Sequence, residues 1–263
     1  MRLRSGIALI GALIAVGAIA AIYFTLGIHW ISLVVVLATV ILGYILAAIG
    51  AAVTSAAAFE EFMRGWLVGW NSALNGFLLL AVAGLFAPIA VAAIIGAVFG
   101  VFALISIFKP ISQNEVYQGF LGWFNWFMPM SWLIIGLGFL FYVVCFLCHA
   151  VTLGKVNYLK IVGLSVDWKT GTFFIKGGLI SNLNPIDTAF NMGNFSFVDY
   201  KSGGWHKEHE AGHTLNLGAF GSIFHLIGAL DENATPRGAN AYSERLAESN
   251  DTGTGGNNIP MWA

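Results

Sequence analysis

Long apolar runs, each close to the length that crosses a bilayer, constrain this chain more than any other feature of its sequence. Residues 6–27 form the first run and residues 30–52 the second, with a short turn between them. A transmembrane helix needs about 20 consecutive apolar residues, whereas the apolar segment of a secretory signal peptide has about 7–15. We therefore interpret the first run as a retained transmembrane helix and the second as another.

Three further apolar runs precede residue 151. They comprise residues 71–86, 89–108 and 131–150. Between the second and third runs, residues 56–70 contain Glu60, Glu61 and Arg64, and we predict a polar interruption at the membrane interface there. The fold class that follows is a membrane protein with a polytopic α-helical bundle of about five transmembrane helices. Because Cys145 and Cys148 lie inside the last run without a second pair, we interpret them as small residues of a membrane helix.

The charged residues divide the chain near residue 150. Of the 263 residues, 10% are charged, against about 25% in an average soluble domain. Seven charged residues lie in 1–150 and eighteen in 151–263. We therefore predict a transmembrane helical domain at 1–150 and a second domain at 151–263. The net charge of −1 comes without any basic block, which excludes a nucleic-acid partner because phosphate binding needs concentrated Lys and Arg.

The second domain is predicted to be a small α+β unit. Residues 158–168 and 172–177 are typical of two strands joined by a turn, and a third strand is expected within residues 190–200. A helix is expected from about residue 205, apolar over 215–230, followed by a loop at 231–238 and a short helix at 239–249. The tail, residues 250–263, is rich in Gly and Asn and is expected to be irregular.

An HExxH motif begins the longer helix of this domain. His209 and His213 are four positions apart, so they lie on one face of a helix and can share a zinc ion. Glu210 lies beside that face, where its carboxylate can act as a general base toward a zinc-bound water. The motif therefore predicts metal-assisted hydrolysis.

A zinc site of this kind needs a third protein ligand and an open position. The metzincin pattern is excluded, because Asn216 and Ala219 stand where its Gly and His should follow His213. The gluzincin pattern places a Glu on a following helix, and Glu244 fits that position. Glu248, one turn later, is predicted to orient a ligand histidine. The alternative is a helix with two solvated glutamates.

Other residues near the motif have weaker signals. Tyr242 is a candidate hydrogen-bond donor to the oxyanion of a zinc hydrolase. Residues 195–200 are a candidate edge strand that pairs with an extended peptide, or an ordinary strand of the sheet. His206 is expected to be solvated, and His225 is expected to pack on the apolar half of the helix.

Three segments of this chain resemble a family of uncharacterised bacterial membrane proteins. Here they read HEAGHTLN at 209–216, LGAFGSIF at 217–224 and YSERLAE at 242–248, where the family has patterns like HEYGHTLQS, LGPLYL and TERWAD. The resemblance covers about residues 185–250 and implies a zincin-like, gluzincin-type domain. Ala211, Asn216 and Glu248 depart from the family's aromatic residue, Gln and Asp.

Two functions are open at this point. The first is a membrane-embedded zinc metallopeptidase whose substrate is a membrane-proximal polypeptide. The second is a non-catalytic scaffold or accessory subunit that joins partner membrane subunits and keeps a zincin-like domain. Both predict an integral protein of the bacterial inner membrane. Arg2 and Arg4 favour a cytoplasmic N-terminus, so five crossings would place residues 151–263 outside the cytoplasm. If any one run fails to span, these residues lie on the cytoplasmic side instead.

Overall fold

A computed structural model describes residues 2–27, 30–183, 189–250 and 259–262. Among these residues, five helices are long and apolar enough to cross a membrane. They are α1 (Arg2–Leu26), α2 (Trp30–Ala52), α3 (Ala57–Ala83), α4 (Ile89–Leu104) and α7 (Trp132–Val151). The chain is mostly helical, as predicted. The expected turn at 27–29 and most of the expected irregular tail lie outside the described residues.

Helix α3 corrects the predicted interruption at residues 56–70. It runs unbroken from Ala57 to Ala83, so the ionisable residues lie inside a long helix. Two of them are paired through Glu61: Arg64 forms an ion pair with Glu61, and Lys109 Nζ lies 3.3 Å from Glu61 Oε1. Buried charges are tolerated when they are paired in this way. The partner Lys109 is distant in sequence, so a local pattern could not reveal the pairing.

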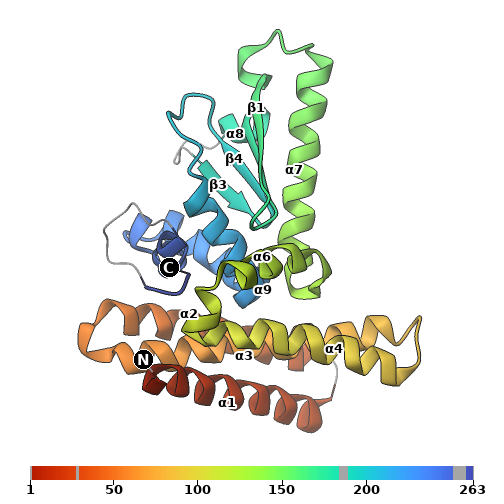
Figure 1. Cartoon of the computed structure of the whole chain (residues 1–263), viewed down its shortest axis with the longest axis vertical. Helices are drawn as coiled ribbons and strands as arrows, with labels where there is room; N and C mark the ends of the chain where they lie inside the picture. The colour runs from red at the N-terminus through yellow and green to blue at the C-terminus, as the bar shows by residue number, and fades with distance from the viewer. Residues whose placement is uncertain (1, 28–29, 184–188, 251–258, 263) are drawn as a thin grey trace.

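Helices α1 and α3 pack closely because glycines of each helix lie against the backbone of the other. A Cβ atom at Gly65 would overlap the carbonyl oxygen of Ala8, and one at Gly11 would overlap that of Phe62. Small residues allow helix backbones to approach in this way. Helices α1–α4 thus form one layer at one end of the molecule (Figure 1).

The described residues contain one four-stranded sheet with the order β1-β2-β4-β3. Its strands are β1 (Ile161–Asp167), β2 (Thr172–Gly177), β3 (Ala189–Met192) and β4 (Phe195–Val198). The predicted β1–β2 hairpin is confirmed. The single strand predicted within 190–200 is instead an antiparallel hairpin, because Gly193, with φ of 75°, makes a tight turn. Strand β4 pairs with both β2 and β3, so the candidate edge strand at 195–200 is internal, and the edge strands are β1 and β3.

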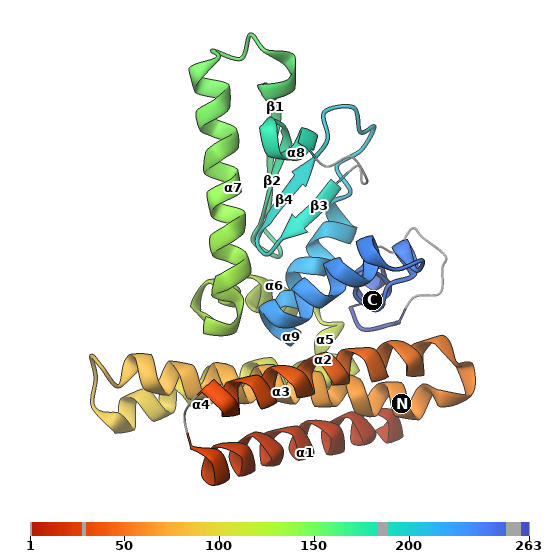
Figure 2. The ribbon, with the colours of Figure 1, turned by 180° about the vertical axis from the view of Figure 1, so that it is seen from behind.

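Helix α7 packs against this sheet rather than beside α1–α4. Ile134, Ile135 and Cys145 share a buried cluster with strand residues such as Phe197. Both views show α7 running across the direction of α1–α4 (Figures 1 and 2). The five apolar helices therefore do not form one parallel bundle. The outward side of α7 is apolar and exposed, with Leu133, Leu140 and Leu147 seven residues apart.

The larger core joins both ends of the chain. Helix α9 (Lys207–Ala234) bends at Gly221, which has φ of 79°, and α10 (Tyr242–Ala247) packs beside it. The core cluster includes Tyr44 and Trp70 of the bundle together with Phe224 of α9. Packing therefore continues across residue 150, where the change in charge density predicted a domain boundary.

Shorter helices connect these elements. The α-helical ones are α5 (Lys109–Ser112), α6 (Glu115–Phe124) and α8 (Leu179–Leu183); the 3-10 turns are η1 (Thr54–Ala56), η2 (Ile105–Ile107), η3 (Asn125–Phe127), η4 (Pro129–Ser131), η5 (Asn157–Leu159), η6 (Gly238–Asn240) and η7 (Glu248–Asn250). The helix predicted at 239–249 is thus divided into η6, α10 and η7. The loop predicted at 231–238 is shorter than expected, because α9 continues to Ala234.

Candidate metal centre

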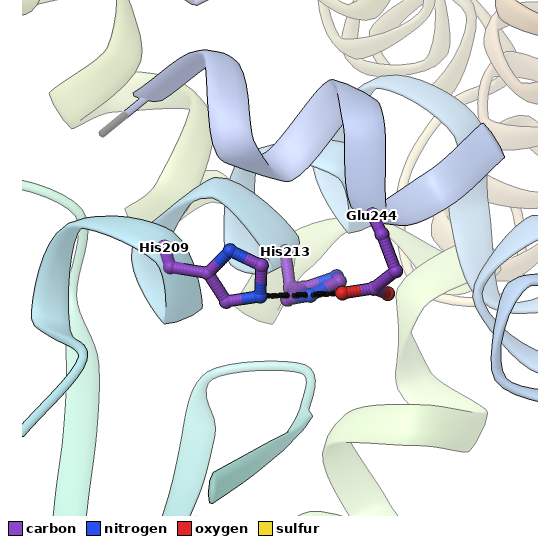
Figure 3. Close-up of side chains that lie close together, drawn as sticks. All are labelled: His209, His213 and Glu244. Carbon is purple, nitrogen blue, oxygen red and sulfur yellow. Dashed lines mark hydrogen bonds and ion pairs between the residues drawn. The ribbon is translucent and has the colours of Figure 1, made fainter. Parts of the chain in front are cut away.

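The HExxH motif lies near the start of α9, with α10 opposite it. His209 and His213 are one turn apart on α9, and Glu244 reaches them from α10 (Figure 3). His213 Nε2 lies 3.2 Å from His209 Nε2 and 3.2 Å from Glu244 Oε2. His209 Nε2 and Glu244 Oε2 are also 3.2 Å apart. The three predicted metal ligands therefore meet as a regular triangle of donor atoms.

This triangle has the dimensions of one face of a zinc tetrahedron. The edge of a regular tetrahedron is about 1.6 times its centre-to-vertex distance, so 3.2 Å edges correspond to a central ion about 2.0 Å from each donor, the usual length of Zn–N and Zn–O bonds. Two imidazoles and one carboxylate are also a ligand set typical of catalytic zinc. The residues present, His209, His213 and Glu244, could hold a metal ion.

Glu248 makes the contact that its spacing predicts. Its Oε2 atom lies 2.7 Å from His209 Nδ1, on the side of the imidazole away from Glu244. Burial alone would lower the pKa of His209, but hydrogen bonds to Glu244 and Glu248 and the charge of Glu210 raise it to about 10. Such a carboxylate fixes the ring orientation and leaves Nε2 directed at the metal position.

The two other carboxylates of the site have opposite electrostatic environments. Burial would raise the pKa of Glu244, but the charge of His213 and hydrogen bonds from both histidines hold that pKa far below its usual range. Burial raises the pKa of Glu210, although the neighbouring histidines oppose the shift. Glu210 is buried, and its Oε2 atom has no hydrogen-bond partner among the described residues. Glu210 therefore has an oxygen available to accept a proton.

A pocket of about 690 Å³ opens over these residues. Its lining combines the candidate metal ligands of α9 and α10 with apolar side chains from α7, α8 and the edge strand β3. The apolar side chains are Phe141, Ile180, Leu183, Phe190 and Met192. The site is therefore accessible, with one polar wall and one apolar wall.

Two residues of this pocket were not assigned a role from the sequence alone. The Asn191 side chain donates to Glu210 O at 3.0 Å, and the Asn191 carbonyl oxygen accepts a hydrogen bond from His225 Nε2 at 3.0 Å. Burial lowers the pKa of His225 to about 4, so its ring is neutral. These two hydrogen bonds connect β3 to α9. His225 is buried and His206 is exposed, both as predicted. His206 also lines the pocket, with its Nε2 atom 3.1 Å from Ser202 Oγ.

Tyr242 does not lie where the oxyanion role requires it. Its hydroxyl is buried and donates to Glu60 Oε1 of the bundle at 2.8 Å. Residues two positions apart on a helix point about 200° apart, so Tyr242 faces away from the metal side when Glu244 faces it. Asn216 of α9 holds α10 in place, because its side-chain amide donates a hydrogen bond to Ser243 O at 3.0 Å.

Comparisons with protein-family models, with curated proteins and with solved structures find no match to this chain.

Proposed function

We propose that this protein is a membrane-embedded zinc metallopeptidase of the gluzincin type. The observation that carries the proposal is the 3.2 Å triangle of His209, His213 and Glu244, with the unpartnered carboxylate oxygen of Glu210 beside it. A structural helix pair has no need for three converging donor atoms and a buried free carboxylate, since each buried charge costs free energy when unpaired.

Each residue has a distinct part in the proposed reaction. His209, His213 and Glu244 would hold the zinc ion, which would supply a Lewis acid for the scissile carbonyl and would lower the pKa of a water to about 7. Glu210 takes the proton of the attacking water on its free Oε2 and then gives it to the leaving amine. Burial raises the pKa of Glu210, which is the direction that a carboxylate acting first as a base and then as an acid requires.

An extended polypeptide is the substrate that fits the pocket. Strand β3 is an edge of the sheet and lines the pocket beside His209, so a substrate strand can pair with its backbone. The apolar wall, including Phe141 and Phe190, favours substrates with bulky apolar side chains.

We infer that α1–α4 cross the inner membrane of a bacterium and that α7 does not. Helices that cross one bilayer lie within about 40° of its normal, and α7 runs across α1–α4 (Figure 1). With Arg2 and Arg4 marking a cytoplasmic N-terminus, an even number of crossings returns residues 109–263 to the cytoplasmic side. This replaces the extracytoplasmic placement expected from five crossings.

The metal content of purified full-length protein tests the first part of the proposal. We expect one zinc per chain in the parent and loss of zinc in Glu244→Ala, because that substitution removes a ligand. A parent without zinc that also fails to take up added zinc would reject the metal centre.

Glu210→Gln separates the peptidase from the non-catalytic scaffold or accessory subunit. The variant keeps all three ligands, so it should bind zinc normally while cleavage of apolar peptides falls about 10²–10⁴-fold with the loss of the general base. If Glu210→Gln cleaves as fast as the parent, or if neither protein cleaves, the scaffold is favoured.

A further inference from the structure

Helix α10, which carries Glu244, is too short to hold its own position. It has six residues, and its N-cap, Ala241, offers no side-chain hydrogen bond. Isolated helices shorter than about 12–15 residues are marginal in water, and an uncapped start leaves backbone N–H groups without partners. The placement of Glu244 therefore depends on contacts that α10 makes with the rest of the molecule.

Residues from other elements supply the missing cap. The backbone N–H of Tyr242 donates to Asp231 Oδ2 at 3.3 Å, and that of Ser243 donates to the hydroxyl oxygen of Tyr44 at 3.3 Å. Tyr44, on α2, in turn donates its hydroxyl hydrogen to Asp231 Oδ2 at 3.0 Å. The carboxylate of Asp231 also lies at the positive end of the α10 dipole, where negative charge is favourable.

Helix α3 of the bundle holds the same end of α10 through a side chain. The Tyr242 hydroxyl donates to Glu60 Oε1 at 2.8 Å, and the rings of Tyr44 and Tyr242 meet edge to face with centroids 5.7 Å apart. Farther along α10, Arg245 Nη1 donates to Ala51 O at 3.1 Å. Contacts from α2 and α3 thus hold Tyr242, Ser243 and Arg245, the residues on either side of Glu244.

We propose that Tyr44, Asp231, Glu60 and Tyr242 are positioning residues through which the bundle sets the third metal ligand. The inference rests on the proposed zinc site. These residues touch neither the metal position nor the substrate; they determine where α10 presents Glu244 to His209 and His213. Metal affinity is consequently a property of the bundle as well as of α9, and a shift of α2 or α3 changes it.

Tyr44→Phe and Tyr242→Phe test the proposal, because each removes one hydroxyl and keeps the ring. Tyr117→Phe is the matched control, since its buried hydroxyl donates to Phe102 O at 2.8 Å without touching α10. All variants are full-length proteins in detergent, and each is measured with Zn²⁺ against a competing chelator and with Co²⁺ by its visible absorption spectrum. Thermal unfolding shows whether each variant is folded.

We expect Tyr44→Phe and Tyr242→Phe to bind Zn²⁺ about 10–100-fold more weakly than the parent, as for other residues that orient metal ligands, and to alter the Co²⁺ spectrum. Tyr117→Phe should keep the parent affinity and spectrum. Equal affinities in the parent and in both test variants would overturn the proposal, as would a comparable loss in Tyr117→Phe.

Amide hydrogen exchange in the metal-free protein separates this inference from the zinc site itself. Loss of either hydroxyl should speed exchange at residues 242–247, because local opening becomes easier, and Tyr117→Phe should leave it unchanged. If the parent binds no zinc, the proposed function fails, and the exchange rates alone decide whether these contacts hold α10. Unchanged exchange in both test variants then rejects the positioning role.

Discussion

At the scale of single residues, the protonation of His209 would determine how the proposed centre takes up metal. Its raised pKa, about 10, means that metal-free His209 carries a proton at pH 7, which zinc must displace from Nε2. Zinc affinity should therefore rise with pH between 6 and 8, about tenfold per unit for each proton released. Competition titrations at several pH values measure the slope. A flat profile would mean that His209 is already neutral in the metal-free protein.

Glu248 offers a second test at this scale. Glu248→Ala removes the carboxylate 2.7 Å from His209 Nδ1, so the ring loses its orientation and zinc should bind about 10–100-fold more weakly. Glu208→Ala is the control, because this exposed side chain lies on the same helix. Equal affinities of the two variants would remove Glu248 from the metal centre.

The candidate site residues whose proximity was predicted are those placed by local helix geometry. His209 and His213, and likewise Glu244 and Glu248, are four residues apart, and this spacing places each pair on one helix face. Tyr242 lies two residues before Glu244, so the same geometry directs it away from Glu244 and argues against its role as an oxyanion donor. Its actual partner, Glu60, lies 182 positions away, so no local pattern reveals the contact.

At the scale of elements, the close approach of α9 and α10 depends on Gly212. A Cβ atom there would overlap the carbonyl oxygen of Ala247, so Gly212→Ala must push α10 away from the histidines. We expect a loss of about 1–3 kcal/mol in the free energy of unfolding and weaker zinc binding. Thermal unfolding and chelator competition measure the two effects.

Gly17→Ala is the matched control for that prediction. Gly17 lies in α1, and a Cβ atom there would meet nothing within 4 Å. Alanine in a helix is favoured over glycine by about 0.5–1 kcal/mol, so this variant should be neutral or slightly more stable. If Gly212→Ala behaves like Gly17→Ala, the two helices are less tightly packed than the structure indicates.

Apolar runs predicted the elements well where nothing interrupted them. Helix α2 has the predicted bounds, Trp30–Ala52, because its sequence contains no charged residue. Helix α3 was divided in the prediction because Glu60, Glu61 and Arg64 look like a polar interface. Glu61 forms ion pairs with Arg64 and Lys109, and Glu60 accepts a hydrogen bond from Tyr242. This tertiary arrangement overrides the local pattern.

At the scale of the whole molecule, the division at residue 150 follows charge density but not packing. A fragment of residues 151–263 would lack α7, which contributes to the buried cluster under the sheet. It would also lack α2 and α3, which contribute to the larger core. We therefore expect this fragment to aggregate or to lack a zinc site, as seen by gel filtration and metal analysis. A monomeric fragment that binds zinc like the full chain would show that the second unit folds independently.

Whether α7 crosses the membrane determines on which side of the membrane the C-terminal part of the chain lies. If α1–α4 cross and α7 lies along the membrane, a reporter fused at the C-terminus should be on the same side as the N-terminus. Single cysteines introduced at exposed Leu153 and at Arg4 should then react with impermeant thiol reagents from the same face, in a background where Cys145 and Cys148 are replaced. Labelling of the two positions from opposite faces would mean that α7 crosses as a fifth span, and that α7 and the bundle are aligned differently in the bilayer.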